Sequence, residues 1–221
     1  MSELSLADLV ENRTMSASTA ETLRAAAREG HSFGVFAIPR LAGKSTTLGA
    51  MLDERVTDAP VCIVTGEAAE QGALRERREG GYLVVPEILG GPSTNAPSEY
   101  IFGEPVRRVF ATLAWGYALA FTLHAAGLQE TFDILTRNGV TDVEASRIRL
   151  AVYLRSIGEW EDPEKRRVSE VHEVLRVVDG VPEARLLHRW DEATDTFMDV
   201  DRPRIIGHGA PADRSNGGGA D

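Results

Sequence analysis

Short apolar runs alternate with amphipathic stretches over the first two thirds of the chain. Helical spacing of apolar residues predicts helices over 4–12 and 19–29, and the apolar, β-prone run 32–38 predicts a buried strand. Strands alternating with helices predict a mostly parallel sheet covered on both faces. A second buried strand is predicted over 59–65, and further strands over 81–85, 98–103 and 117–123. The further helices are predicted over 45–54, 106–114, 128–138 and around 142–146.

The pattern changes near residue 149, where strand-like segments follow one another without helices between them. They are joined by turn signals such as Asp179-Gly180 and predict an antiparallel continuation of the sheet. From residue 206 the apolar pattern ends, which predicts a disordered tail. We therefore expect a helical lead-in over 1–31, one α/β domain over 32–205 and a tail over 206–221. The antiparallel strands are predicted over 149–157, 166–178, 184–190 and 196–200.

The composition is that of a folded protein, and we expect it to be cytoplasmic. Of the 221 residues, 43% are apolar and 26% are charged, which are globular proportions. The sequence shows no long apolar run and no export signal at its start, so we expect neither a membrane span nor secretion. A single cysteine, Cys62, excludes a disulfide framework. A net charge of −10 argues against broad nucleic-acid binding, and no nucleic-acid partner is expected.

The segment Ile38–Thr46 carries the first candidate chemistry. It ends in Gly43-Lys44-Ser45-Thr46 between a predicted strand and a predicted helix, which is the second half of a phosphate-binding loop. Backbone amides at this helix N-terminus would face a β-phosphate. Lys44 would bridge the β- and γ-phosphates, and the Ser45 hydroxyl would hold Mg²⁺. The alternative is an ordinary helix start, because serine is a common N-cap.

Four further motifs follow GKSTTLGAML (43–52) in order along the chain. They are VTGEAAE (64–70), YIFGEPVRR (100–108), GYALAFTLHAAG (116–127) and RRVSEVHEV (166–174). With these motifs the chain resembles the secretion and type IV pilus traffic ATPases, the hexameric motors of type II and type IV secretion and of pilus assembly. The resemblance covers about residues 8–178. It implies a RecA-like P-loop NTPase core that binds ATP and Mg²⁺.

The resemblance also implies partners and a location. It implies a homo-oligomeric ring that works with an inner-membrane platform protein of a secretion or pilus machine, at the inner face of the cytoplasmic membrane. The family has an N-terminal domain that clamps ATP. Because only about 30 residues precede the phosphate loop here, we expect that domain to be absent unless another protein supplies it.

Site residues carry over from the family motif by motif. In the acidic box, which faces the γ-phosphate and Mg²⁺ in the family, Glu67 and Glu70 match two of the three acids, and Gly66 replaces the first. The strand ending in Gly103-Glu104 matches the Walker B element, so Glu104 is predicted to bind Mg²⁺ through water or to orient the attacking water. His124 matches the histidine box and is predicted to sense the γ-phosphate or to hydrogen-bond Glu104. Taken singly, such acids and histidines are most often solvated or structural, and it is the order of the motifs that favours function.

The chain departs from the family motifs at several positions, and these departures make nucleotide binding a more secure expectation than hydrolysis. Ile38 replaces the first glycine of the loop, Thr94 stands where the family has an arginine near the phosphates, and Tyr117 replaces the first histidine of the histidine box. The sequence leaves two hypotheses: an ATPase that drives a trans-envelope machine, or a degenerate, non-hydrolysing homologue that acts as a nucleotide-sensing regulatory or scaffold subunit. The candidates for the missing positive charge are Arg40, Arg75, Arg77, Arg78, Arg107 and Arg108.

Overall fold

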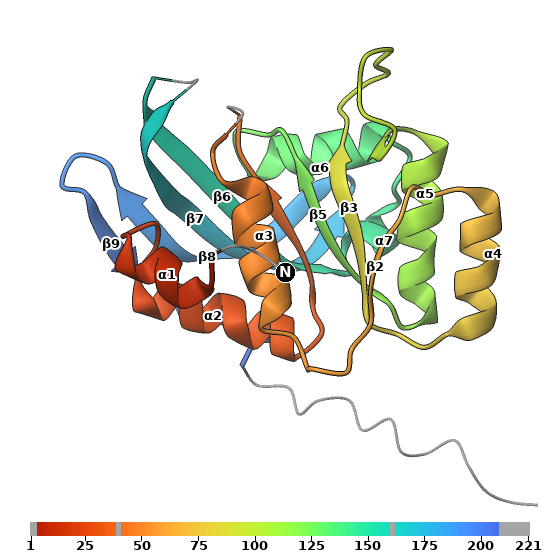
Figure 1. Ribbon diagram of the computed structural model, residues 1–221, viewed down its shortest axis with the longest axis horizontal. Coiled ribbons are helices and arrows are strands. Elements are labelled where there is room, and N and C mark those ends of the chain that lie inside the picture. The colour runs from red at the N-terminus through yellow and green to blue at the C-terminus, as the bar shows by residue number, and fades with distance from the viewer. Residues whose placement is uncertain (1–3, 39–40, 160–161, 208–221) are drawn as a thin grey trace, which may run out of the picture.

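Within the described residues, nine strands form one sheet, and helices cover both of its faces (Figure 1). The structure is a computed structural model that describes residues 4–38, 41–159 and 162–207. The strands are β1 (Ser32–Phe36), β2 (Val61–Ile63), β3 (Tyr82–Ile88), β4 (Tyr100–Ile101), β5 (Ala118–Leu123), β6 (Ile148–Gly158), β7 (Pro163–Val178), β8 (Val181–Asp191) and β9 (Thr196–Asp199). The helices are α1 (Leu6–Glu11), α2 (Ala17–Arg28), α3 (Lys44–Asp53), α4 (Ala68–Arg77), α5 (Glu104–Ala111), the 3₁₀ turn η1 (Thr112–Trp115), α6 (Leu128–Arg137) and α7 (Asp142–Ala145).

The sheet has a parallel part and an antiparallel part. Its strand order is β2-β3-β5-β1-β6-β7-β8-β9, with β4 beside β3. Strands β2, β3, β5, β1 and β6 run parallel, and β7, β8 and β9 each run antiparallel to the strand before them. The strand that precedes the phosphate-loop segment, β1, therefore lies between β5 and β6 inside the parallel part. The prediction of a RecA-like α/β core with antiparallel C-terminal strands is confirmed.

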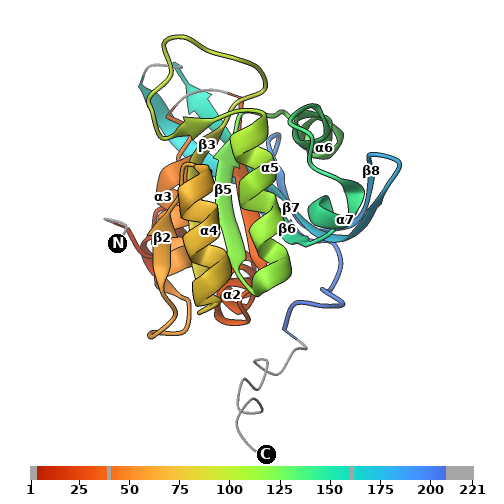
Figure 2. The same ribbon diagram turned by 90° about the vertical axis from the view of Figure 1, so that its right-hand side faces the viewer.

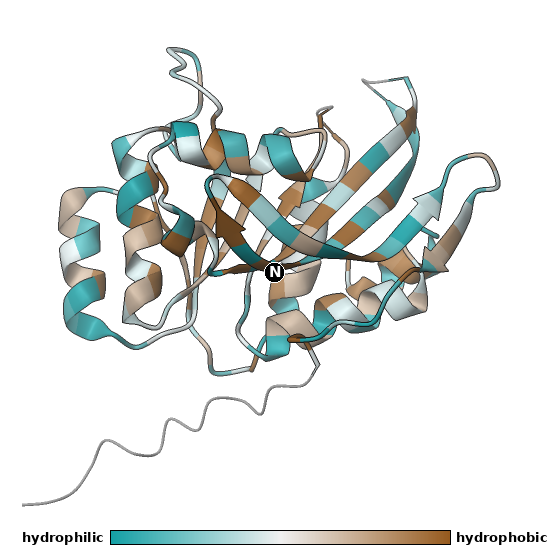
Figure 3. Cartoon of the chain, turned by 180° about the vertical axis from the view of Figure 1, so that it is seen from behind, coloured by the Kyte–Doolittle hydropathy of each residue, from teal (hydrophilic) through white to brown (hydrophobic). Residues whose placement is uncertain are grey.

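Two apolar clusters, one on each face of the sheet, hold the helices in place. Helices α1, α2 and α3 pack on one face, and α4 to α7 pack on the other (Figure 2). Alternate residues of β5 contribute to the two clusters: Ala118 and Ala120 belong to the first cluster, and Leu119 and Phe121 to the second. Figure 3 shows the apolar colour running along the strands between the two helical layers.

The lead-in helices share the core of the sheet. Ser5 caps α1 in a capping box with Asp8, and Ser16 caps α2. Leu6 and Leu23 are fully buried in the same cluster as residues of β1. These helices thus help to form the face of the sheet that carries α3, and a domain boundary at residue 31 stays a prediction.

The predicted strands over 59–65 and 98–103 differ from those observed. The segment 59–65 was expected to be buried, but its strand β2 forms an edge of the sheet, and Ile63 is 67% exposed because it has a neighbour on one side only. The segment 98–103 forms just the two residues of β4, which pair with the end of β3. The stretch before β4 is rich in Gly, Pro, Ser and Asn, which favour a loop over a longer strand.

The chain after β9 returns to the core. Ile206 is buried, and its N–H donates to Glu173 Oε1 at 3.0 Å. The tail predicted over 206–221 lies, from residue 208 onward, outside the described residues.

A buried arginine ties β7 to the β8–β9 turn. Arg167 is 3% exposed and donates from Nε and Nη2 to the two carboxylate oxygens of Asp195, at 2.8 and 3.0 Å. Trp190 Nε1 donates to the same carboxylate at 2.9 Å, and Arg13 Nη2 lies 3.7 Å from it. The hydrogen bonds from Arg167 and Trp190 hold the pKa of Asp195 well below its usual range.

We expect Asp195→Asn to lower the free energy of unfolding at pH 7. The folded pKa of Asp195 lies below its unfolded value of about 4, so its contribution is complete above about pH 5 and is lost as the pH falls toward the folded pKa. Urea titrations of wild type and variant from pH 7 to pH 3 should show a stability difference that shrinks below pH 5. As a control, Glu192→Gln breaks an exposed pair with Arg155 and should have little effect. An Asp195→Asn difference that stays constant over this range would contradict the assignment.

Candidate functional site

A cavity of about 1170 Å³ opens at the carboxyl ends of β1, β3 and β5. It is lined by the phosphate-loop segment with the first turn of α3, by the end of β3 and the segment that follows it, by residues around α1 and by the β6–β7 hairpin. Parallel α/β folds bind their ligands at this edge of the sheet. Because the charged and polar residues of several elements meet here, the cavity is the candidate site.

Gly43 shapes the loop between β1 and α3. It has φ +94°, and α3 begins at the next residue, Lys44. A Cβ at position 43 would lie 3.2 Å from Arg166 Cδ, so both the backbone and the available space favour glycine. Glycine has no side chain with which to cap the helix. The start of this ten-residue helix therefore presents the positive end of its dipole to the cavity, as an anion-binding site does.

Lys44 and Glu87 form a buried ion pair in the cavity wall. Lys44 is 9% exposed and Glu87 is 4% exposed. The ammonium Nζ lies 3.1 Å from Glu87 Oε2 and 3.4 Å from Oε1. Burying either charge without a partner is costly, so Lys44 leaves Glu87 at low cost only if an anion takes the place of the carboxylate.

Glu87 lies at an irregularity near the end of β3. Pro86 has no N–H to donate to the ladder, and the register of β3 on β5 shifts between Val85 and Ile88. Thr122 of β5 fills the gap: its hydroxyl lies 2.6 Å from the Pro86 carbonyl and 2.8 Å from Glu87 Oε2. The irregularity and Thr122 together hold the Glu87 carboxylate beside Lys44.

His124 follows β5 and lines the same cavity. Its Nδ1 lies 2.8 Å from the Ile38 carbonyl, which can only accept, so Nδ1 donates and carries a proton. Its Nε2 lies 3.9 Å from Glu87 Oε1, and the side chain is 41% exposed. The ring is thus oriented by the loop backbone, with Nε2 on the side of Glu87.

The structure brings together part of the predicted site. Gly43, Lys44, Ser45, Thr46 and His124 all line the cavity. Within the part of the chain that the structure describes, the acids Glu67, Glu70 and Glu104 are not among the lining residues.

Glu104 lies in the first turn of α5 instead of at the end of a strand beside β1. Its carboxylate pairs with Arg107 Nη1 at 2.9 Å and with Arg108 Nε at 3.6 Å. The expected placement fails because β4 ends at Ile101 and extends the sheet only beside β3.

The acidic-box residues Glu67 and Glu70 lie at the start of α4, outside the cavity lining. Glu67 is the residue before α4, and Glu70 accepts hydrogen bonds from the amides of Thr65 and Gly66 at 3.1 and 2.8 Å. These contacts hold the turn between β2 and α4.

The arginines considered for the missing charge lie elsewhere or outside the described residues. Arg107 and Arg108 pair with Glu104, Arg75 lies 6.0 Å from the Trp115 ring centre, and Arg77 pairs with Glu79. Arg40 is outside the described residues. Of the described arginines in this group, including Arg78, none lines the cavity.

Sequence analysis missed Glu87 and Arg166, both of which line the cavity. The signal for Glu87 was present: the apolar run Tyr82–Val85 is followed within two residues by a carboxylate. The predicted strand over 81–85 ends two residues before Glu87 and so leaves it out. Arg166 begins the motif RRVSEVHEV (166–174), but the motif suggests no contact with the loop, because that contact depends on the β6–β7 hairpin folding back toward the loop.

The described residues hold no group of three His, Cys, Asp or Glu side chains able to form a metal site of their own. A cation in the cavity would need ligand oxygens in addition to Ser45 and Glu87, which is the way in which proteins commonly bind Mg²⁺ with phosphates. In the same described part of the chain, no helix has the length and apolar character needed to cross a bilayer.

Comparison with solved structures supports the fold. The chain is similar to the VirB11 ATPase of the Brucella suis type IV secretion system, solved in complex with sulphate, with 16% identity and a TM-score of 0.50 over 76% of this chain and 54% of that one. It is also similar to the ATPase DotB of Legionella pneumophila, with 16% identity and a TM-score of 0.53 over 78% and 52% of the two chains. For DotB of Yersinia pseudotuberculosis the values are 12%, 0.51, 78% and 49%.

These likenesses establish a secretion-ATPase-like fold. The chain spans about half the length of each of the ATPases that it matches. No protein family and no curated protein matches the sequence.

Proposed function

We propose that the chain binds Mg-ATP in the cavity and hydrolyses it, as an ATPase of the type II and type IV secretion and pilus assembly family that drives a trans-envelope machine. One observation carries the proposal. A buried lysine at the start of α3 is paired with a buried carboxylate from the end of β3, a parallel strand of the same sheet, in a cavity of about 1170 Å³. Phosphoryl transfer needs such a cation for the phosphates and such an acid for Mg²⁺ or water.

The residues of the loop would bind the triphosphate. The N-terminus of α3 attracts phosphate oxygens, and Lys44 exchanges its contact with Glu87 for a contact with the phosphates. Glu87 is thereby released to face the cavity, held in position by Thr122. The pair in the structure is thus a resting arrangement that an anionic ligand opens.

The residues at the cavity fit a magnesium ion. Ser45 lies in the first turn of α3, exposed to the cavity, and Glu87 offers carboxylate oxygens across from it; hard oxygens of this kind are the ligands that Mg²⁺ prefers. When bound, Mg²⁺ neutralises negative charge on the β- and γ-phosphate oxygens. Glu87 would then orient the attacking water, and His124 would report on the γ-phosphate through its Nε2.

The partners follow from the proposed family. We propose a homo-oligomeric ring that acts on an inner-membrane platform protein, at the cytoplasmic face of the membrane and without direct contact to nucleic acid. VirB11 is an ATPase of a type IV secretion system, and DotB is an ATPase, which supports this placement. Because these ATPases are about twice as long as the matched part, the remaining functions of a motor would be supplied by further protein segments.

A second candidate is a non-hydrolysing, nucleotide-sensing regulatory or scaffold subunit. Two observations favour it. Ile38 occupies the position of the first loop glycine and is 53% exposed, and the segment with Ser93, Asn95 and Pro97 that lines the cavity brings no arginine to it.

Phosphate release from Mg-ATP by the purified chain separates the two candidates. The proposed ATPase should turn over ATP, with specific activity that rises with protein concentration as rings form. Light scattering over the same dilution series measures assembly. Saturable ATP binding with no turnover at any concentration would establish the second candidate. Absence of both binding and turnover would refute the proposal.

A further inference from the structure

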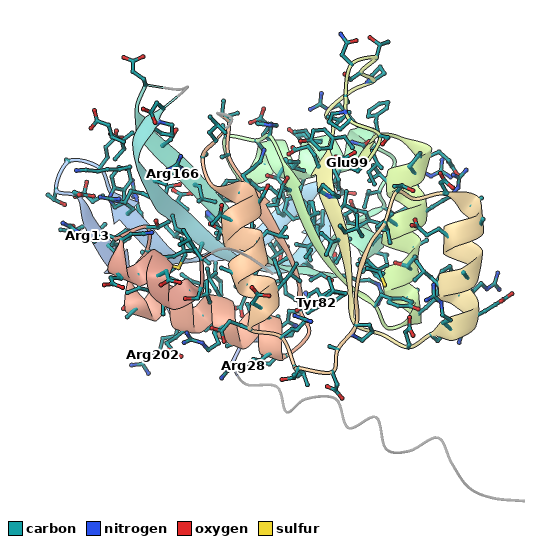
Figure 4. All side chains as sticks on the ribbon, viewed as in Figure 1. Arg13, Arg28, Tyr82, Glu99, Arg166 and Arg202 are labelled. Atoms are coloured by element: carbon teal, nitrogen blue, oxygen red, sulfur yellow. The ribbon has the colours of Figure 1, made fainter. Side chains whose placement is uncertain are left out.

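Arg166 of β7 contacts the phosphate-loop segment from the hairpin beside it. Its Nε donates to the Leu41 carbonyl at 2.8 Å, and its Cδ lies 3.2 Å from where a Cβ on Gly43 would be. Figure 4 shows Arg166 on β7 beside the amino end of α3. Because Gly43 directly precedes α3, this guanidinium lies next to the positive end of the helix dipole.

The contact with Leu41 supports a loop that lacks its usual glycine. Leu41 has φ +61°, a left-handed conformation that is unfavourable for a residue with a Cβ, and its side chain is exposed. Ile38 stands where the first loop glycine would give the chain its freedom. The bond from Arg166 therefore holds a backbone conformation that Leu41 would not adopt by itself.

The rest of the guanidinium is available to the cavity. Within the described residues, the Leu41 carbonyl is the acceptor that Arg166 uses, through Nε, and no carboxylate forms an ion pair with it. Its neighbour Arg167 is held by Asp195, and Lys44 is held by Glu87. The acids among the described lining residues are Glu87 and Glu164, and neither forms an ion pair with Arg166. An anionic ligand in the cavity could therefore bind the Nη groups.

We propose that Arg166 is a phosphate-binding residue of the nucleotide site, holding Leu41 with Nε while its Nη groups bind the phosphates. This inference rests on the proposed function. The planar guanidinium suits the task, because it can donate to a carbonyl and to a phosphate at the same time. Arg166 would supply from the same chain the positive charge that Thr94 does not supply. No arginine from a neighbouring subunit is then needed for binding.

A double-mutant cycle with Leu41 separates phosphate binding from loop support. Leu41→Gly removes the steric cost of the left-handed conformation, so the loop no longer depends on the contact with Arg166 to hold it. Calorimetric titration with Mg-ATP should show that Arg166→Gln weakens binding on the order of 10- to 100-fold, as expected for a lost charge-assisted hydrogen bond. The same factor should appear when Arg166→Gln is made in the Leu41→Gly chain. Arg166→Lys should give an intermediate affinity, because it keeps the charge.

Arg155→Gln is the matched control. It removes an arginine of the same hairpin that is exposed, paired with Glu192 and outside the cavity lining, and should leave ATP affinity unchanged. If Arg166→Gln weakens binding in the wild-type loop but not in the Leu41→Gly chain, Arg166 only supports the loop and the inference is wrong. Wild-type affinity in Arg166→Gln also overturns it and leaves the proposed function intact. Failure of the wild-type chain to bind ATP overturns both.

Discussion

Lys44→Ala should weaken Mg-ATP binding on the order of 100-fold or more. Lys44 is the buried ammonium at the start of α3, and we propose that it exchanges Glu87 for the phosphates when ATP binds. Removing the ammonium from such a buried, hydrogen-bonded pair with a phosphate costs about 3 kcal/mol, which is roughly 100-fold in affinity. Calorimetric titration of the purified variant measures the loss. An affinity equal to that of the wild type would remove Lys44 from the nucleotide site.

The same substitution leaves Glu87 buried without its partner, so loss of binding must be separated from loss of folding. The double variant Lys44→Ala/Glu87→Gln removes both charges and should fold, as judged by circular dichroism and thermal melting. It should still fail to bind Mg-ATP. Restored binding in the double variant would mean that Lys44 only neutralises Glu87.

Glu87→Gln should leave nucleotide binding largely intact and lower kcat on the order of 10²- to 10⁴-fold, the contribution typical of a positioned acid–base group. The amide keeps the shape of the side chain and an acceptor for Lys44, but it loses the charge that would hold Mg²⁺ or water. Phosphate release at saturating Mg-ATP measures kcat, and titration of the same sample measures binding.

Glu104→Gln is the matched control, and it tests the role that the family motif predicts for Glu104. In the structure Glu104 is partly exposed and paired with Arg107 and Arg108. The kcat of the Glu104→Gln variant should therefore stay close to that of the wild type. If Glu104→Gln loses turnover and Glu87→Gln does not, the family motif is right and the geometric assignment is wrong.

The sequence was sufficient to predict the fold and to place part of the candidate site in the cavity. The alternation of apolar strands and amphipathic helices over 32–155 predicted the parallel core, and the later turn signals predicted its antiparallel extension. Gly43 and Lys44 could be placed because a strand, a loop and a helix are consecutive, so their geometry is local.

The acid opposite Lys44 could not be assigned in the same way, because the order of the strands in the sheet cannot be deduced from the sequence of each strand. A carboxylate near the end of β3 and one just after β4 look alike along the chain, and only the pairing of β3 with β5 brings Glu87 to Lys44. The exposure of β2 has the same origin: its apolar residues predicted burial, but its position at the edge of the sheet leaves Ile63 uncovered. Arg166 is the extreme case, since it lies more than 120 positions after the Leu41 carbonyl that it contacts.

The most direct test of the account is a crystal structure of the chain with Mg²⁺ and a non-hydrolysable ATP analogue. The account predicts the triphosphate at the N-terminus of α3, with Lys44 Nζ moved from Glu87 to a phosphate oxygen, Mg²⁺ between Ser45 and Glu87, and Arg166 in contact with the phosphates. An analogue bound away from α3, with the Lys44–Glu87 pair still closed, would contradict it.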